Sequence, residues 1–134
     1  MEKYQFDPAV KSSLENAPVP LAVYQFIDRR VVTLILSQGF LDLFGFEDRE
    51  EAYFVMDNDM YRSTHPDDMS RIADAAFRFA TEGGEYNVVY RSRAENNGRV
   101  TVIHAQGRHV YTETVERLAY VWYAVEGDYE EEEG

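Results

Sequence analysis

The chain has 134 residues, 45% of them apolar, which is enough for one domain with a hydrophobic core. It contains no cysteine, which excludes disulfides, thiolate nucleophiles and cysteine-ligated metals and agrees with the cytoplasmic location that we expect. Its formal net charge of −12 argues against a nucleic-acid partner, and no apolar run approaches the ~20 residues that cross a membrane, so we expect no direct membrane contact.

The first predicted element is a helix that begins at Asp7 and Pro8. Asp is a favourable N-cap, and Pro suits the first helical position because the N–H that it lacks has no partner there. Val10 and Leu14 follow at helical spacing and form a thin apolar stripe. We expect residues 1–17 to form a flanking helix, with Val10 and Leu14 as the candidate interface with a second copy of the chain.

Two β-rich runs, residues 21–27 and 31–37, follow this helix. The three-residue connection between them, Asp28-Arg29-Arg30, predicts an antiparallel hairpin.

Helical periodicity begins after the hairpin. Phe40 and Phe44 lie in one short predicted helix, which Gly45 can end in the left-handed conformation. Asp48 and Glu51 have the spacing of a capping box, which predicts that a second short helix begins there.

The clearest helix in the sequence begins at Pro66 and ends at Gly83. Pro at the first position has the right fixed φ, and Asp67 and Asp68 in the first turn suit the positive end of the helix dipole. Apolar residues recur at helical spacing and predict the buried face, which consists of Met69, Ile72, Ala73, Ala76, Phe77 and Ala80.

The rest of the chain has the pattern of strands. Residues 86–91 alternate, Asn97-Gly98 predicts a type I′ hairpin turn, and residues 99–111 and 118–125 form two further strands. The predicted fold class is therefore α+β, with a five-stranded antiparallel sheet that carries short helices and one long helix on one face. Residues 126–134 are interpreted as an acidic tail or a truncated linker.

Four motifs in this order resemble the PAS domain family, over residues 14–125. Gly39-Phe40-Leu41-Asp42-Leu43-Phe44-Gly45-Phe46 is similar to the small-helix motif of the family, and His65-Pro66-Asp67-Asp68 resembles the His-Pro-Asp-Asp signature of one large subfamily. Tyr86-Asn87-Val88-Val89-Tyr90-Arg91 is similar to the family strand that ends in Tyr-Arg, and Asn97-Gly98 stands where the subfamily has Asp-Gly. The resemblance assigns residues 18–125 to a PAS domain of a bacterial signalling protein.

The resemblance implies a non-catalytic sensory domain that binds a small ligand or a partner. Such a domain regulates a downstream output domain, such as a diguanylate cyclase or a histidine kinase, and acts as a homodimer. The sequence departs from the family at the end of the last strand, where Ala124-Val125-Glu126-Gly127 replaces the common Asp-Ile-Thr. The family uses that Asp-Thr pair to couple the sheet to the downstream helix, so the resemblance leaves the coupling geometry of this chain undefined.

The resemblance also bears on cofactors. Haem-binding relatives use a histidine on the long helix, and residues 66–80 contain none. Light-sensing relatives use a cysteine to bond flavin, and the chain has none. We therefore expect neither haem nor a cysteinyl flavin, while a non-covalently bound flavin remains an alternative. We expect no metal site.

A candidate ligand cavity is expected between the helices and the sheet, where tyrosine hydroxyls and a histidine would supply polar contacts to an apolar or aromatic ligand. The alternative interpretation of the same residues is plain hydrophobic core. His65 precedes a helix-starting proline, so we expect it to close the helix N-terminus. Two other functions stay open, a ligand-free dimerisation module and a small cone-shaped α+β enzyme that uses His104. The candidate cavity residues are Phe40, Phe44, Tyr61, Phe77, Tyr90, His104 and Trp122.

Overall fold

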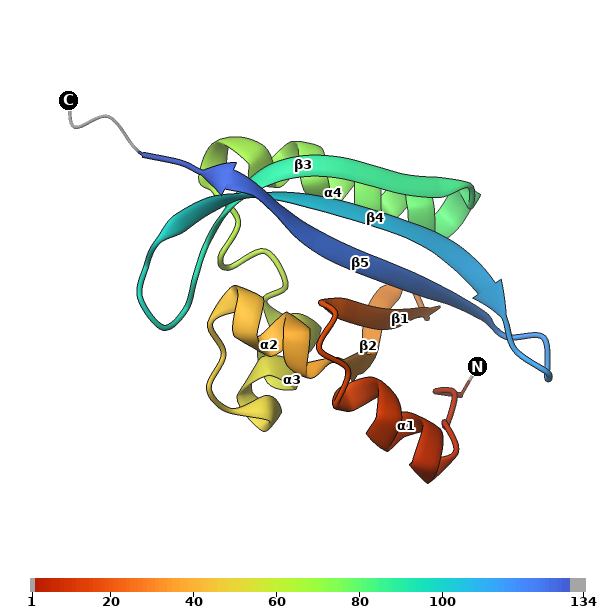
Figure 1. Ribbon diagram of the computed structural model, residues 1–134. Coiled ribbons are helices and arrows are strands. Elements are labelled where there is room, and N and C mark those ends of the chain that lie inside the picture. The colour runs from red at the N-terminus through yellow and green to blue at the C-terminus, as the bar shows by residue number, and fades with distance from the viewer. Residues whose placement is uncertain (1, 131–134) are drawn as a thin grey trace.

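A computed structural model describes residues 2–130, which form a five-stranded antiparallel sheet with the strand order β2-β1-β5-β4-β3 (Figure 1). The sheet is therefore built from strands of both ends of the chain, and the α+β fold predicted from the sequence is confirmed. The elements in chain order are α1 (Pro8–Glu15), β1 (Leu21–Ile27), β2 (Arg30–Leu36), α2 (Gln38–Phe44), α3 (Arg49–Asn58), α4 (Pro66–Glu82), β3 (Glu85–Arg93), β4 (Val100–Tyr111) and β5 (Arg117–Asp128).

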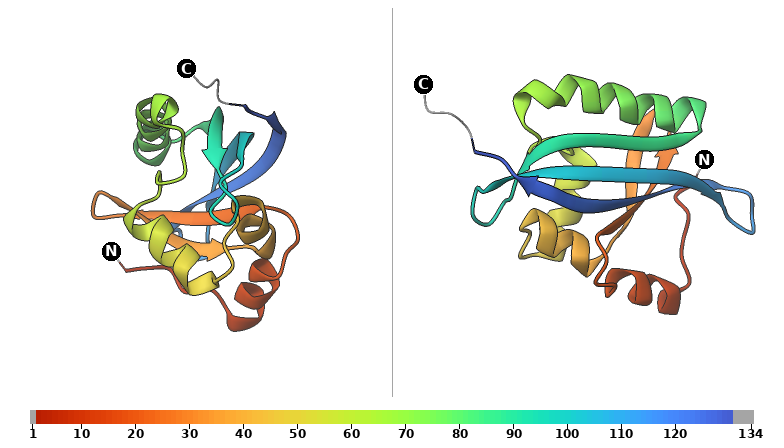
Figure 2. Two further views of the ribbon diagram at one scale, coloured as in Figure 1. Left: turned by 90° about the vertical axis from the view of Figure 1, so that its left-hand side faces the viewer. Right: turned by 45° about the horizontal axis from the view of Figure 1, so that its top comes forward.

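The sheet is packed on both faces. On the inner face, α2, α3 and α4 cover the sheet, and α4 runs alongside β3 (Figure 2). On the outer face, the N-terminal segment covers only β1, β2 and the start of β5, where Tyr4, Phe6 and Leu14 pack against a second, smaller core. None of the residues 2–130 covers the outer face of β3 and β4 in this way, and its apolar side chains are partly exposed. Among residues 2–130, no helix has the length and apolarity needed to span a membrane.

The sequence signals at the helix ends are confirmed. The side chains of Asp7, Asp48 and His65 each accept a hydrogen bond from a backbone N–H in the first turn of the following helix. His65 does so with Nδ1, which lies 3.1 Å from the backbone nitrogen of Asp67. Gly45 ends α2 with a φ of 78°, a left-handed conformation that favours glycine.

Two turns differ from the prediction. The β1–β2 connection has two residues, Asp28 and Arg29, with positive φ at both, as in a type I′ turn. The β3–β4 connection is longer, residues 94–99, and only Gly98 has positive φ there, so Asn97-Gly98 is not a type I′ turn.

The last strand is longer than expected, because β5 continues to Asp128 in pairing with β4. Arg99 supports this extension with an ion pair 2.7 Å long to Asp128. Residues 126–128 therefore belong to the sheet, and of the expected acidic tail that the structure describes only Tyr129 and Glu130 lie beyond it. Residues 131–134 of that expected tail lie outside the described residues.

Candidate functional site

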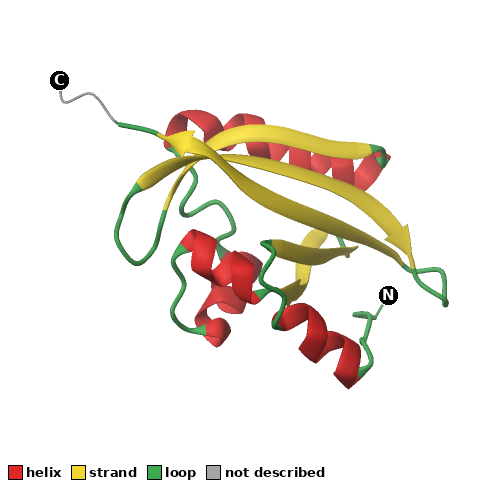
Figure 3. Ribbon diagram, viewed as in Figure 1, coloured by secondary structure: helices red, strands yellow, loops and turns green. Residues whose placement is uncertain are grey.

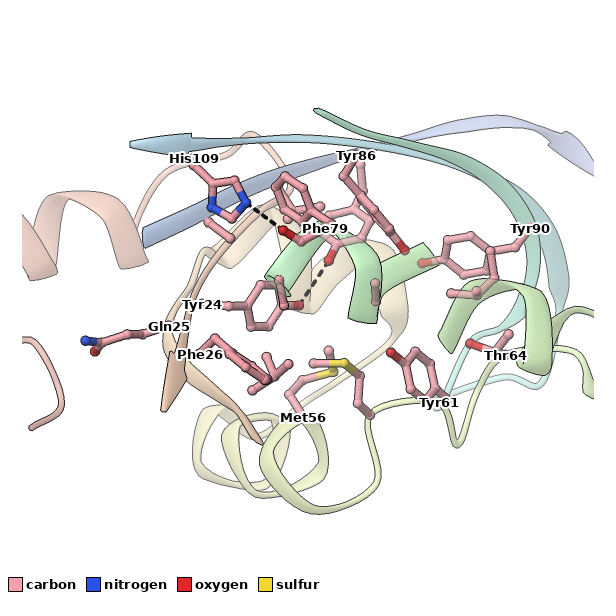
Figure 4. Close-up of a pocket in the computed structure, with 18 of the residues that line it drawn as sticks. Tyr24, Gln25, Phe26, Met56, Tyr61, Thr64, Phe79, Tyr86, Tyr90 and His109 are labelled. Carbon is pink, nitrogen blue, oxygen red and sulfur yellow. Dashed lines mark hydrogen bonds between the residues drawn. The ribbon is translucent and has the colours of Figure 1, made fainter. Parts of the chain in front are cut away.

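A cavity of about 100 Å³ lies between α4 and the inner face of the sheet (Figure 4). Five tyrosines contribute to its wall, and we call it the tyrosine cavity. The other contributors are aliphatic, aromatic and thioether side chains, three neutral polar groups and one arginine. The lining residues are Tyr24, Gln25, Phe26, Val31, Met56, Met60, Tyr61, Thr64, Ile72, Ala76, Phe79, Ala80, Tyr86, Tyr90, His109, Arg117, Ala119, Val121 and Tyr123.

Small side chains leave the space that the cavity occupies. Ala76 and Ala80 are the two smallest of the four α4 residues that line the cavity, and Ala119 lines it from β5. Gly107 on β4 lets the ring of Tyr86 lie close to the sheet, since a Cβ at Gly107 would lie 3.3 Å from the Cβ of Tyr86. The cavity is thus wide where α4 carries alanines.

The five tyrosines reach the cavity from four parts of the chain: Tyr24 from β1, Tyr86 and Tyr90 from β3, Tyr123 from β5, and Tyr61 from the loop between α3 and α4. Figure 3 distinguishes the strands, in yellow, from the loops, in green. The hydroxyls of Tyr24 and Tyr123 are 3.0 Å apart and form a hydrogen bond. The hydroxyls of Tyr61, Tyr86 and Tyr90 make no hydrogen bond to the residues that the structure describes, and Figure 4 shows them directed toward one region of the cavity.

Burial keeps these phenols neutral. It raises the pKa of Tyr61 and Tyr86, and it raises that of Tyr90 well above the ordinary value of 10.0. Burial likewise raises the pKa of Tyr24 and of Tyr123. Each hydroxyl can therefore donate one hydrogen bond and accept others at any physiological pH.

The end of the cavity near the C-terminus of α4 carries its polar nitrogen groups. Nε2 of His109 lies 2.8 Å from the carbonyl oxygen of Phe79, so Nε2 carries the proton and donates. Arg117 donates to the carbonyl oxygen of Ala80. Both carbonyls belong to the last turn of α4, where backbone partners are few, and the carbonyl of Phe79 also accepts from the backbone N–H of Gly83. Side chains of β4 and β5 therefore complete the cap of the helix. Burial lowers the pKa of His109 and favours the neutral imidazole.

The start of α4 is fixed by an ion pair between Asp68 and Arg91 on β3, with Oδ1 of Asp68 2.8 Å from Nη2 of Arg91. The hydrogen bonds from Arg91 hold the pKa of Asp68 well below its usual range. Arg71 on α4 donates to the carbonyl oxygen of Val89, 2.8 Å away. Helix α4 is therefore tied to the sheet at both ends, while its middle faces the cavity.

The structure brings together four of the seven predicted cavity residues. Tyr61 and Tyr90 line the tyrosine cavity. Phe40 and Phe44 line a smaller neighbouring cavity of about 40 Å³, together with Tyr90.

The other three predicted residues lie elsewhere, which corrects their assignment to the cavity. Phe77 is 59% exposed on the solvent side of α4, because the ties at both helix ends rotate Phe79 inward in its place. His104 and Trp122 lie on the outer face of the sheet. His104 contacts Asn87 at 2.7 Å and Glu126 at 3.0 Å, and Trp122 donates to Gln106 at 3.1 Å.

Several lining residues were missed in the sequence, namely Tyr24, Phe79, Tyr86, His109 and Tyr123. Tyr86 could have been found, because it lies four residues before Tyr90 and strand alternation puts both on one face. Tyr123 and His109 depend on which face of β4 and β5 points inward, and the sequence leaves that undecided.

The two candidate interface residues differ in exposure. Val10 is 48% exposed, whereas Leu14 packs against the second core on the outer face of the sheet. Val10 is therefore the accessible one of the pair.

Comparison with solved structures identifies the fold. A light-oxygen-voltage domain studied with a flavin analogue has a TM-score of 0.66 at 14% identity, covering 89% of this chain and 85% of that one. The light-state dimer of the fungal blue-light photoreceptor Vivid has a TM-score of 0.61 at 17% identity, covering 92% and 82%. A PAS domain from a two-component sensor histidine kinase has a TM-score of 0.58 at 14% identity, covering 88% and 94%. No curated protein sequence matches the chain significantly.

The light-oxygen-voltage likeness raises the question of whether a flavin fits this chain. Pockets that hold drug-sized ligands usually measure roughly 300–1,000 Å³. The tyrosine cavity, at about 100 Å³, is much smaller. The residues present therefore do not fit a flavin.

The sequence itself matches a family model. The model of the PAS fold aligns with residues 33–124, more than half of the chain. The match begins in β2 and ends in β5, and so includes α2, α3 and α4 and most of the residues that line the tyrosine cavity. This chain therefore belongs to the PAS fold family.

Proposed function

We propose that this PAS domain is a non-catalytic sensory input domain that binds a small ligand in the tyrosine cavity. PAS domains are signal-sensing modules, among them the sensor histidine kinase domain to which this chain is similar. The carrying observation is that Tyr61, Tyr86 and Tyr90 face the cavity with hydroxyls that have no hydrogen-bond partner among the described residues. These hydroxyls are accessible from the cavity, so a ligand that forms hydrogen bonds with them gains affinity over one that does not.

Ligand binding would act on α4. This helix is tied to the sheet at both ends, by Asp68 at its start and by the carbonyls of Phe79 and Ala80 at its end. A ligand that contacts Ala76, in the middle of α4, would favour one distance between the helix and the sheet over another. A signal results if the ligand binds the protein with different affinities at the two distances.

A route from α4 to the end of the sheet exists at Arg91. This residue binds Asp68 and also donates a hydrogen bond, 3.1 Å long, to the hydroxyl of Tyr129, just after β5. Its guanidinium lies 5.0 Å from the centre of the Tyr129 ring. We propose that this contact takes the place of the missing Asp-Ile-Thr in coupling the sheet to the chain that follows.

Native mass spectrometry of the purified protein, with thermal denaturation, tests the ligand proposal. A bound small molecule should appear as an added mass, and it should be lost from an Ala76→Leu variant, in which the new side chain fills the cavity. Ala75→Leu is the matched control, since Ala75 does not line the cavity. Binding that survives in Ala76→Leu would place the ligand elsewhere.

We further propose a cytoplasmic signalling protein in which residues 18–125 act on an output domain of the histidine kinase or diguanylate cyclase kind. The support is the likeness to the PAS domain of a two-component sensor histidine kinase. Fusion of the domain to a kinase output in cells, with the Arg91→Ala variant beside wild type, tests it. Equal output from the two fusions would contradict the route through Arg91.

We also propose that the domain acts as a homodimer through the exposed side of α1. The support is Val10, an apolar side chain that is 48% exposed on a helix whose Leu14 packs against the second core. Val10→Asp should convert a dimer to a monomer in light scattering without unfolding it, because Val10 contributes little to the core. A dimer that persists in Val10→Asp would exclude this surface as the interface. A wild-type protein that is a dimer but binds no small molecule would favour the alternative of a ligand-free dimerisation module.

An enzymatic function based on His104 finds no support in the position of this residue. His104 lies on the outer face, where it contacts Glu126 and Asn87, and does not line the tyrosine cavity. A His104→Ala variant that loses a measurable turnover of the wild type would restore this alternative.

A further inference from the structure

We infer that the tyrosine cavity selects a compact ligand, about the size of a benzene ring or smaller, that carries an oxygen acceptor and no positive charge. This inference rests on the proposed function, since it names the chemical class of the ligand for the same cavity. It follows from the volume of the cavity, from the tyrosine hydroxyls that face it and from the charge of the residues that line it.

The volume sets the size of the ligand. A cavity of about 150 Å³ lined by apolar side chains binds benzene. The tyrosine cavity is somewhat smaller, about 100 Å³, and so has room for a small ring or a short chain without large substituents. Met56 and Met60 in the wall are unbranched and can shift to admit a ring.

The hydroxyls set the polar part of the ligand. Tyr61, Tyr86 and Tyr90 present three neutral O–H groups that lack acceptors among the residues described. The Tyr24–Tyr123 pair next to them already satisfies one of its donors internally. Three donors that converge on one region match a carbonyl or a phenol oxygen, which can accept from two of them at once.

The charge of the wall disfavours a cation. The chain as a whole is strongly acidic, with 25 Asp and Glu residues, yet no Asp or Glu is among the residues 2–130 that line the tyrosine cavity. Within that part of the chain the only formally charged lining side chain is Arg117, which would repel a positive ligand. A cation placed here would lose its hydration without gaining a carboxylate partner, which is costly in a buried site.

Four aromatic probes of similar size separate these properties. Phenol and benzaldehyde carry an oxygen acceptor, toluene has none, and benzylammonium has a positive charge. We expect phenol and benzaldehyde to bind in NMR titrations of the labelled protein, with shifts at the residues that line the cavity. Toluene should bind roughly tenfold more weakly, and benzylammonium should not bind there.

Conservative variants show whether the hydroxyls are responsible. Tyr86→Phe and Tyr90→Phe should each weaken phenol binding roughly three- to tenfold and leave toluene binding unchanged, because each variant removes one oxygen and no ring. Tyr111→Phe is the matched control, since Tyr111 is 63% exposed on β4 and lies outside the cavity.

The outcomes distinguish the ligand class from the function. Benzylammonium binding in the cavity, or toluene binding as tight as phenol, would overturn the class and leave ligand sensing intact. The same holds if no probe binds but native mass spectrometry finds another molecule that Ala76→Leu expels. If neither probes nor a co-purified molecule occupies the cavity, it holds only water, and the proposed function falls together with this inference.

Discussion

Asp68 and Arg91 join the first turn of α4 to β3 through a two-pronged ion pair. Nη2 of Arg91 lies 2.8 Å from Oδ1 of Asp68, and Nε lies 2.9 Å from Oδ2. The backbone N–H of Arg91 also donates to Oδ2, at 2.9 Å. Three donors from one residue thus bind one buried carboxylate, an arrangement that fixes both the position and the rotation of the helix.

We predict that Asp68→Asn lowers the free energy of unfolding by about 2 kcal/mol near neutral pH, because charge-assisted hydrogen bonds are lost. The pKa of Asp68 in the folded protein lies well below the ordinary value of 3.8. A carboxyl group with a depressed folded-state pKa stabilises the fold above its ordinary pKa, and this stabilisation is lost as the pH falls toward the folded-state value. Urea denaturation of both proteins from about pH 7 down to about pH 2 should therefore show the difference shrinking below about pH 4.

Asp67→Asn is the control for this prediction. Asp67 is in the same helical turn, but its side chain is 78% exposed. We expect a change within about 0.5 kcal/mol. A deficit in Asp68→Asn that stays constant across the pH range would mean that the charge of Asp68 does not contribute.

Phe77 and Phe79 give a matched pair on α4. Phe79 is 7% exposed and lines the tyrosine cavity, whereas Phe77 points to solvent. We predict that Phe79→Ala lowers the free energy of unfolding by about 3–4 kcal/mol. Phe77→Ala should change it by no more than about 0.5 kcal/mol. Urea denaturation of the two variants tests which face of α4 points inward. A larger loss of stability in Phe77→Ala than in Phe79→Ala would show that Phe77 is the buried residue.

These two residues also show where prediction from sequence stopped. The existence of α4 and its start at Pro66 could be predicted, since they depend on local signals, namely a proline, first-turn acids and helical periodicity. The rotation of α4 could not, because Met69, Phe77 and Phe79 are all apolar and the inward face is chosen by Asp68 and the strand residues that bind the helix ends.

The same limit on prediction from sequence applies to the strands. The sheet could be predicted from alternation and turns, but the inward face of β4 and β5 could not. His104 and His109 lie on opposite faces, and so do Trp122 and Tyr123. Both faces carry apolar residues because the outer face is itself partly covered by the N-terminal segment. Alternation therefore gave no sign of which face holds the cavity, and only the pairing of distant strands decides it.

We predict that His109 makes the stability of the fold depend on pH in the neutral range. Burial lowers the pKa of His109 in the folded protein below the ordinary value of 6.5. The unfolded chain therefore takes up a proton first as the pH falls, so the wild type should lose stability between about pH 7 and pH 5. His109→Gln, which keeps a donor for the carbonyl of Phe79, should lack this part of the pH dependence. Denaturation at several pH values measures it, with His104→Gln on the opposite face as the control for loss of one imidazole.

We predict that the hydroxyl of Tyr53 helps to hold α1 against the rest of the domain. Its hydroxyl donates to Oε2 of Glu15 at the end of α1, 2.7 Å away, and accepts from the backbone N–H of Leu36 at 2.9 Å. Arg49, also on α3, donates to the backbone oxygen of Glu15 at 2.9 Å.

Tyr53→Phe removes only the hydroxyl, so it should cost about 1–2 kcal/mol, the range for a partly buried hydrogen-bond network that loses one member. Because the lost contacts join α1 to α3, we expect faster amide hydrogen exchange across residues 8–15 and unchanged exchange in β4 and β5. Tyr111→Phe, at an exposed tyrosine of β4, should leave both regions as they are in the wild type. If exchange in residues 8–15 is the same in Tyr53→Phe as in the wild type, α1 is held by Leu14 and its apolar contacts alone, and the polar contacts to α3 are incidental.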